Sequence, residues 1–369
     1  MNRDAQTGGA EVVLIHDGRP FAARLSARLG ERFRIGIYTV DAPPPPDRHK
    51  GAATVFSLAD AESGGAAVRA TLRAEDAVFV LADARPHQRQ MARALGAGNV
   101  FAEAEPAHLI NGAVIQAVNQ AVESAWQNLS AEEQRALQSS VKSFGSLMTA
   151  GRNGEPLPMA EIHAACEDIR VALGVSDVDR WMNALSGHHD GTYRHSMYVC
   201  GALAFFAHEI GIKGSDLMDL TTGGFLHDVG KSRIPLAILD KPGKLDEAEW
   251  ETMKGHPGFS REIMLREHGL EERIVRMAVH HHEKLDGTGY PDALSSAQID
   301  DPTRLTAIAD VYAALTEERA YKPAMPKEKA FGIMSSFKGH LDMDLLSRFR
   351  EFMLDSSRET AAAPAKLSA

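Results

Sequence analysis

The stretch His281-His282-Glu283-Lys284-Leu285-Asp286-Gly287-Thr288-Gly289-Tyr290-Pro291 places two adjacent histidines directly before a loop that contains glycines and a tyrosine. Upstream, His227-Asp228 joins an imidazole to a carboxylate. Imidazole and carboxylate ligands together suit divalent transition metals, and a set of this size can hold two ions. The glycines allow the loop to approach a substrate phosphate or base closely. Many hydrolases could use such a strip, so it predicts metal-dependent chemistry before it predicts a substrate.

The composition is that of a globular protein with more than one domain. Its 369 residues predict two units and a connector, since a domain usually has ~100 to 200 residues. The two cysteines, Cys166 and Cys200, disfavour a disulfide scaffold and suit a reducing cytoplasm. No stretch approaches ~18 uninterrupted apolar residues, and the first residues lack a signal-peptide pattern, so we expect a cytoplasmic protein without membrane insertion. A formal net charge of -10 disfavours nucleic acid as a partner and leaves phosphate recognition to a local pocket.

The N-terminal part alternates short apolar runs with helical patterns, which predicts a parallel α/β sheet. We expect strands at 12–15, 33–38 and 77–81 and a helix at about 21–29. The stretch 91–101 reads as a helix end, a glycine turn and a short strand. In this respect residues 10–122 resemble the receiver domains of response regulators, which implies a flavodoxin-like α/β domain.

The phosphorylation chemistry of receivers looks absent. Asp17 survives from the acidic pair, with His16 beside it, and Ala82 stands at the expected Thr or Ser position. Glu105-Pro106 stands where the resemblance implies Lys-Pro, which reverses the charge. Asp60 could accept a phosphoryl group but fits the strand register poorly. These departures favour a pseudo-receiver that binds partners or dimerises over a phosphorylated switch.

A helical pattern over about 115–148 predicts a connecting helix, which we place at 123–150. Apolar residues recur at helical spacing, and Ser130 followed by Glu133 is a helix-capping signal. Pairing of this helix in a coiled-coil homodimer and ordinary packing within one chain both stay open. The stretch 151–156 is the clearest break, and beyond it the pattern is almost wholly helical.

Ten of the sixteen histidines fall between His188 and His282. His195 opens an apolar helix that runs to about Ile210. His227-Asp228 ends a helix at 217–226, and we expect Gly230 to stop it and Lys231 to point back into the same cavity. Downstream, His256 adds a nitrogen donor and Asp310 a closing carboxylate. Potential ligands are therefore concentrated in the C-terminal half.

Five elements occur here in order. They are His-Ser-x-x-Val at His195, Leu-His-Asp-x-Gly-Lys at His227, Met-Lys-x-His-Pro at His256, His-His-Glu-x-x-Asp-Gly-x-Gly-Tyr-Pro at His281 and Ala-Asp-Val-Tyr at Asp310. Over about 180–355 the chain thereby resembles the HD-GYP domains, a branch of the HD superfamily of metal-dependent phosphohydrolases that cleave cyclic di-GMP. The resemblance implies an all-α HD-type helical bundle. We place this domain at 155–358 and expect a flexible tail at 359–369.

The resemblance also implies roles for particular residues. The expected metal ligands are His195, His227, Asp228, His256, His281, His282 and Asp310, with Asp228 between two divalent ions, iron or manganese. A hydroxide that bridges the ions would be the nucleophile. Lys231 would contact the scissile phosphate beside Asp228. Tyr290, Arg319 and Lys322 would bind the dinucleotide.

Some positions depart from the family pattern. Gly191 stands where some members carry a glutamate that allows a third metal, so we expect two ions; neighbouring Asp190 could compensate only if its loop bends. Ala313 replaces a common aspartate, a change that we treat as tolerated. His188, His189 and His280 have no family role, and we expect them beside the ligands or at the surface.

The leading hypothesis is a phosphodiesterase that opens cyclic di-GMP to linear pGpG, and on to GMP as an open extension, under control of the pseudo-receiver. One alternative is a non-catalytic receptor for cyclic di-GMP, or a module that binds a protein such as a GGDEF-type diguanylate cyclase. Another is an HD hydrolase for a different nucleotide. Metal content and a hydrolysis assay separate the first two.

Overall fold

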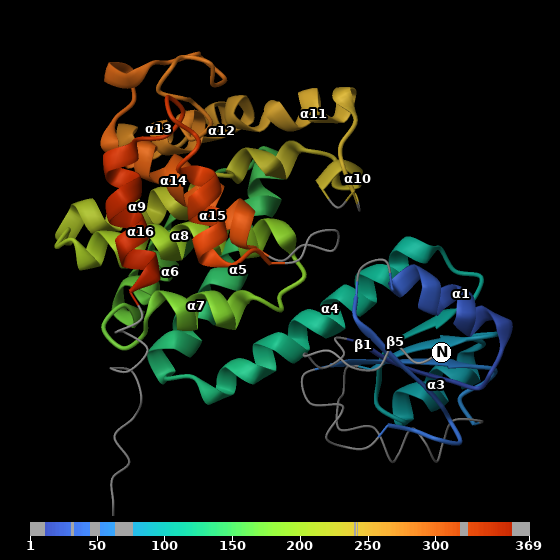
Figure 1. Cartoon of the computed structure of the whole chain (residues 1–369). Coiled ribbons are helices and arrows are strands. Elements are labelled where there is room, and N and C mark those ends of the chain that lie inside the picture. The colour runs from blue at the N-terminus through green and yellow to red at the C-terminus, as the bar shows by residue number, and fades with distance from the viewer. Residues whose placement is uncertain are drawn as a thin grey trace, which may run out of the picture. The chain divides into compact units, whose positions relative to one another are not determined.

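The structure is a computed structural model that describes residues 12–30, 33–44, 52–62, 77–239, 241, 243–317 and 324–355. Contacts divide the chain into two compact units. One comprises Met1–Trp126 with Gly187–Asp190, and the other comprises Gln127–Ser186 with Gly191–Ala369. Figure 1 draws the first unit mainly in blue and teal and the second from green to red.

The N-terminal unit is built on a parallel five-stranded sheet with the order β2-β1-β3-β4-β5 (Figure 1). The strands are β1 (Val12–His16), β2 (Ile35–Thr39), β3 (Ala53–Leu58), β4 (Ala77–Leu81) and β5 (Ala97–Ala102). This is a doubly wound order that receivers share with flavodoxins. The expected α/β class is confirmed, and β2 begins two residues later than its apolar pattern predicts.

Alternate side chains of the strands fill two apolar clusters, one on each face of the sheet. Even-numbered residues such as Val12 and Leu14 pack with α1 (Pro20–Leu29) and α4 (Ala107–Ala125). Their neighbours Val13 and Ile15 pack in the other cluster, which includes Ala92 of α3 (Pro86–Ala94). Since both faces are covered, the central strands need apolar residues at every position, and β4 is buried throughout.

Two Arg–Glu pairs lie where the strands end. Glu105 accepts hydrogen bonds from Arg89 at 2.6 Å and from the backbone of Ala102 at 2.9 Å. The backbone bond, reinforced by Arg89 against partial burial, lowers the pKa of Glu105. Arg19 pairs with Glu103 in the same region. Glu105, which stands where the resemblance implies a lysine, therefore already has its charge balanced by Arg89 within the unit.

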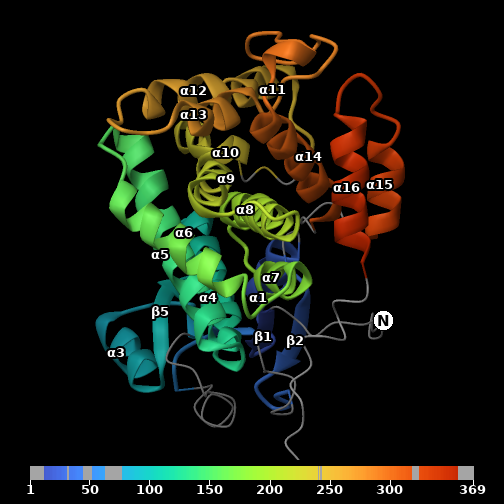
Figure 2. The same cartoon turned by 90° about the vertical axis from the view of Figure 1, so that its left-hand side faces the viewer.

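The C-terminal unit is helical, and its described residues contain no β-strand. Its helices are α5 (Ala131–Asn153), α6 (Met159–Ala172), α7 (Val178–Leu185), α8 (Gly191–Glu209), α9 (Gly214–Leu226), α10 (Leu236–Leu239), α11 (Glu247–Lys254), α12 (His256–Met264), α13 (Glu272–His280), α14 (Asp301–Thr316), α15 (Lys327–Met334) and α16 (Met343–Leu354), with 3-10 turns η3 (Val229–Arg233) and η4 (Ser296–Gln298). Figure 2 shows α15 and α16 side by side at one edge of the bundle.

Helix α8 is the core of this bundle, because every residue from Tyr193 to Ala207 is buried. Helix α9 packs closely on it: a Cβ added to Gly224 would lie 2.8 Å from the Cα of Cys200. On another side, a Cβ at Gly201 would lie 2.3 Å from the Trp181 indole. Glycines thus allow the close helix contacts that bring the segments carrying His195 and His227 together.

Several predicted boundaries are corrected. The pattern at 115–148 is not one helix: α4 ends at Ala125, the 3-10 turn η2 (Trp126–Asn128) follows, and α5 begins after Ser130. Ser130 and Glu133 form the predicted capping box, which supplies the local reason for the restart. Helix α8 begins at Gly191, so His195 lies in its second turn rather than at its opening.

None of the described helices combines the length and the apolar character that crossing a bilayer requires. The predicted tail at 359–369 lies outside the described residues.

Candidate metal centre

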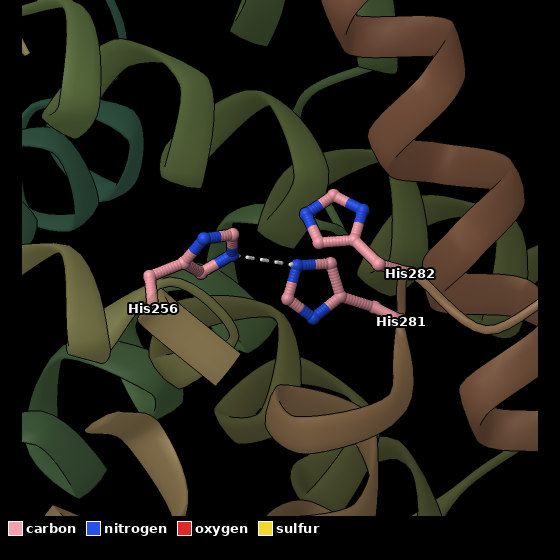
Figure 3. Close-up of side chains that lie close together, drawn as sticks. All are labelled: His256, His281 and His282. Atoms are coloured by element: carbon pink, nitrogen blue, oxygen red, sulfur yellow. Dashed lines mark hydrogen bonds between the residues drawn. The ribbon is translucent and has the colours of Figure 1, made fainter. Parts of the chain in front are cut away.

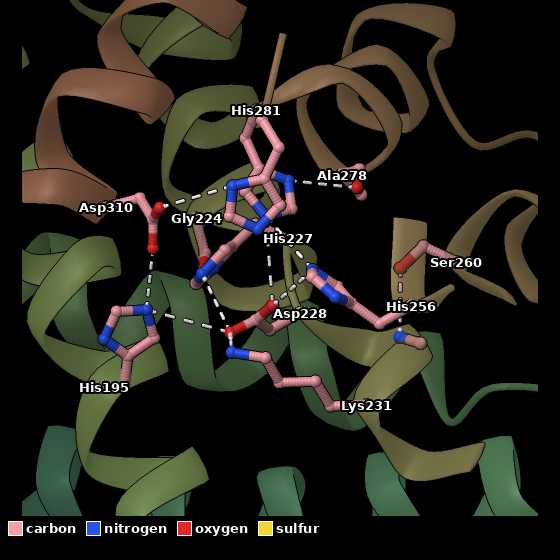
Figure 4. Close-up of polar contacts among 12 residues, drawn as sticks. His195, Gly224, His227, Asp228, Lys231, His256, Ser260, Ala278, His281 and Asp310 are labelled. Atoms are coloured by element: carbon pink, nitrogen blue, oxygen red, sulfur yellow. Dashed lines mark hydrogen bonds and ion pairs between the residues drawn. The ribbon is translucent and has the colours of Figure 1, made fainter. Parts of the chain in front are cut away.

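All seven predicted metal ligands lie together in the helical unit. Figure 4 labels all of them except His282. His195 and Asp310 come from within α8 and α14, whereas His227-Asp228, His256 and His281-His282 come from the ends of α9, α12 and α13. They form three overlapping groups whose ligand atoms lie within 4.8 Å of one another. The groups are His256 with His281 and His282, His195 with His227 and Asp310, and His227 with Asp228 and His281.

Asp228 lies at the centre of the cluster and is almost fully buried. Its Oδ1 lies 3.3 Å from His256 Nε2, and its Oδ2 lies 3.3 Å from His227 Nε2 and 3.8 Å from His195 Nε2. Lys231 donates to the same Oδ2 at 2.5 Å. Its two oxygens thus face different histidines, so this carboxylate would be available to both parts of the ligand set.

Three of the histidines are oriented by carbonyl oxygens at the C-terminal end of the helix that precedes them, α9, α11 or α13. The Nδ1 atoms of His227, His256 and His281 lie 2.8, 2.7 and 3.1 Å from the carbonyl oxygens three residues earlier. The last carbonyls of a helix lack intrahelical partners, so they can accept these N–H groups. With hydrogen on Nδ1, each Nε2 keeps a lone pair for the cluster.

The Gly-Tyr-Pro loop lies against the group of His256, His281 and His282. His256 and His281 approach each other at 3.4 Å between their Nε2 atoms, with His282 beside them (Figure 3). The Tyr290 ring stacks on His282 with centroids 4.9 Å apart. This stacking places the predicted substrate-binding tyrosine directly beside a predicted ligand.

Glu283, whose role the sequence argument did not assign, closes this loop. Its carboxylate accepts from the backbone of Asp292 at 2.6 Å and of Leu294 at 3.0 Å. The loop returns so closely that a Cβ at Gly289 would lie 2.4 Å from the Cα of Glu283. The glutamate therefore holds the Tyr290 loop against the cluster, and the glycine makes the close return sterically possible.

The site favours ionised carboxylates and neutral imidazoles. Burial opposes ionisation of Asp228, but Lys231 and the neighbouring histidines outweigh it and hold its pKa well below the ordinary value. Burial, against the attraction of Asp228, lowers the pKa of His256 to about 3, and burial also lowers the pKa of His281 strongly. At neutral pH these groups are in the protonation states that bind metal.

His195 differs from the other ligands. Burial disfavours its charged form, but the neighbouring carboxylates of Asp310 and Glu317 outweigh burial and raise its pKa to about 9 before metal binds. Its Nε2 lies 2.8 Å from Asp310 Oδ1. This imidazole must therefore give up a proton to become a ligand at neutral pH.

The donor set fits divalent ions. His227 Nε2 and Asp228 Oδ1 are buried and have no hydrogen-bond partner among the described residues. Unpartnered buried donors and acceptors are costly, and metal coordination would satisfy both atoms. Imidazole nitrogens suit iron and carboxylate oxygens suit manganese, so this mixed set fits either metal.

Comparison with known families identifies the helical unit. Residues 180–345 match the family described as the HD domain. The segment that carries this match is called the HD domain below. The match covers all seven clustered ligands together with Lys231 and Tyr290, so the family resemblance expected from the motifs is confirmed.

Curated proteins that are similar to this segment include cyclic dinucleotide phosphodiesterases. The chain is 38% identical over 48% of its length to a 3'3'-cGAMP-specific phosphodiesterase 3 of Vibrio cholerae and 35% identical over 43% to a cyclic di-GMP phosphodiesterase of Pseudomonas aeruginosa. It is 32% identical over 44% to a cyclic di-GMP phosphodiesterase response regulator of Xanthomonas campestris. The matched segments span 38%, 38% and 44% of those proteins, so the chain matches less than half of each.

The remaining predicted residues lie in different places. Arg319 and Lys322, the predicted dinucleotide contacts, lie outside the described residues. A Cβ at Gly191 of the HD domain would meet nothing within 4 Å, so the position of the third-metal glutamate is open space here. His280 Nε2 lies 3.0 Å from Asp292 Oδ2, and His188 Nε2 lies 3.3 Å from Glu123 Oε1.

Proposed function

We propose that this chain is a metal-dependent phosphodiesterase that hydrolyses cyclic di-GMP to linear pGpG. The observation that carries the proposal is the clustering of the other six predicted ligands around buried Asp228, with Tyr290 stacked on His282 among them. The names of the curated relatives support a cyclic dinucleotide as substrate. Further hydrolysis to GMP is a separate extension of the same proposal.

Two divalent ions, iron or manganese, would be held by the clustered histidines and aspartates, and when bound would acidify water and neutralise phosphate charge. The side chain of Lys231 is 19% exposed beside the buried carboxylate of Asp228. Its ammonium is therefore positioned to attract the phosphodiester and to offset charge that develops on its oxygens.

Tyr290 would orient the dinucleotide. Burial, reinforced by the negative charges of Asp310 and Asp228, raises the pKa of its phenol, so it remains a hydrogen-bond donor at neutral pH. Its stacking on His282 restrains the ring at the edge of the centre. Arg319 and Lys322 remain proposed phosphate contacts on the grounds of their motif positions.

A second candidate substrate is 3'3'-cGAMP, because a phosphodiesterase specific for this dinucleotide is 38% identical to the chain. Adenine and guanine differ at the base edge, whereas the phosphodiester and the metal chemistry are the same. Measuring kcat/KM for both dinucleotides under identical reducing conditions decides between them, and a preference for 3'3'-cGAMP would contradict the first choice.

For the N-terminal unit we propose a pseudo-receiver that regulates the HD domain. Ala82 directly follows β4, and Glu105 is paired with Arg89, so neither the expected hydroxyl nor the expected lysine stands at the strand ends. A homodimer and binding to a GGDEF-type diguanylate cyclase are the associated partner proposals. An acyl phosphate that forms on Asp60 or Asp17 on incubation with acetyl phosphate would contradict the pseudo-receiver.

Replacement of His227 and Asp228 together by alanine tests the enzyme proposal. We expect loss of bound iron or manganese, measured by elemental analysis, and loss of pGpG formation, measured by chromatography. A double variant that retains hydrolysis would refute the metal assignment. Wild-type protein that carries both ions but forms no linear product would favour the non-catalytic receptor instead.

A further inference from the structure

The imidazole of His195 cannot be oriented in the same way as the three imidazoles whose Nδ1 donates to a helix carbonyl. Those three follow the C-terminal ends of α9, α11 and α13, where carbonyl oxygens lack helical partners. His195 lies in the second turn of α8, which continues to Glu209. The carbonyl three residues before it is engaged by the continuing helix. Another group must therefore accept the Nδ1–H of this imidazole if Nε2 is to bind metal.

Glu317 is in position to do so. Its Oε2 lies 3.6 Å from His195 Nδ1, slightly beyond hydrogen-bond distance, and Nδ1 is buried without a hydrogen-bond partner among the described residues. Nε2, on the other side of the ring, faces Asp310 at 2.8 Å. The two ring nitrogens thus face two carboxylates, and only the Nε2 side faces the cluster.

The carboxylate of Glu317 is itself held in place by an arginine. It is 1% exposed, and Arg194 donates to its Oε1 at 2.7 Å. Its backbone caps the C-terminal end of α14, the helix that carries Asp310 about two turns earlier. Helix α14 therefore presents one carboxylate to each nitrogen of His195.

We propose that Glu317 is a positioning residue of the metal centre, which accepts the Nδ1–H of His195 and so directs Nε2 toward the ions. This inference rests on the proposed metal centre. A carboxylate behind a ligating histidine fixes its tautomer and increases its basicity, and loss of such a partner usually weakens metal binding by about 10- to 100-fold. Glu317 does not touch the ions or the substrate, so its effect passes through His195.

The test compares Glu317→Leu and Glu317→Gln with wild-type full-length chain, by titrating metal-stripped protein with Mn²⁺ and following free Mn²⁺ by electron paramagnetic resonance. Leucine removes the acceptor, whereas glutamine keeps an acceptor oxygen and loses the charge. We expect the weaker of the two Mn²⁺ dissociation constants to rise by about 10- to 100-fold with leucine and by less with glutamine.

Glu133→Gln is the matched control. Glu133 is also a buried carboxylate, 2% exposed, and Arg180 donates to it at 2.7 Å, but it caps α5 and contacts none of the clustered ligands. We expect it to lower the melting temperature without changing the affinity for Mn²⁺.

The outcomes separate the two proposals. Wild-type protein that binds no Mn²⁺ overturns the metal centre and this inference together. If the wild type binds Mn²⁺, then an unchanged affinity in Glu317→Leu, or an equal loss of affinity in Glu133→Gln, overturns only the role of Glu317. Should the leucine variant fail to fold, the glutamine variant carries the same comparison.

Discussion

Substitution of Gly230 by alanine tests how the backbone of η3 positions the metal centre. Gly230 lies between Asp228 and Lys231 and donates to Ser260 Oγ at 3.0 Å. A Cβ at this position would lie 1.9 Å from the carbonyl oxygen of His256 and 2.6 Å from the Ser260 nitrogen. Real Cβ contacts essentially never fall below 3.0 Å, so η3 and α12 would have to separate by about 1 Å.

That separation has two measurable consequences. Overpacking of this kind costs about 1–3 kcal/mol, which lowers the melting temperature of a unit of this size by roughly 2–12 °C. The same movement pulls His256 from Asp228, which now lie 3.3 Å apart. Since a misplacement of about 1 Å can reduce a rate by ~100-fold, we expect a loss of that order in kcat/KM.

The measurements are differential scanning calorimetry and hydrolysis of cyclic di-GMP, with Gly258→Ala as the matched control. Gly258 lies in α12, the helix on which Gly230 packs, and an added Cβ would meet nothing within 4 Å. This control should be neutral or stabilise the helix by up to about 1 kcal/mol. The reasoning is refuted if Gly230→Ala melts at the same temperature as the control and keeps wild-type kcat/KM.

Three further predictions concern the site. Lys231→Ala should retain both metals by elemental analysis but slow turnover by about 100-fold or more, and an unchanged kcat would remove its role. Glu283→Gln can accept only one of the two backbone hydrogen bonds of the loop, so KM should rise about tenfold at unchanged metal content; an unchanged KM would count against this clamp. In EDTA, the free energy of unfolding should decrease as the pH falls from about 6.5 toward 4, because the low pKa of His256 makes the unfolded chain bind the proton first. In thermal melts, the stability of His256→Gln should depend less steeply on pH than that of the wild type. Equal pH dependences would contradict His256 as the cause.

Much of the site could be predicted from the chain because ligand chemistry is local. His227-Asp228 and His281-His282 are pairs in sequence, and the elements around His195, His256 and Asp310 follow in a recognisable order. The structure brings all of them to one cluster. The α/β alternation of the N-terminal part was equally readable, since buried parallel strands must be apolar on both faces.

Other features could not be predicted from spacing alone. The helical pattern at 115–148 continues through Trp126, yet the chain turns there and restarts at the Ser130 cap, because a cap competes locally with continuation of the helix. Glu283 belongs to a recognised motif, but its role depends on the loop bringing the backbone N–H groups of Asp292 and Leu294 back to its carboxylate. The periodicity of a sequence does not predict such contacts between a loop and an earlier residue.

The sequence by itself determined which atoms are available: imidazoles, carboxylates, a lysine beside Asp228 and a glycine-containing loop before Tyr290. Only the tertiary structure decided which way each atom points. Helix-end carbonyls direct His227 inward, whereas His195, inside a continuing helix, faces Glu317 from a distant part of the chain. The reason is that residue type sets ligand chemistry, while the direction of a lone pair depends on hydrogen-bond partners that only packing brings together.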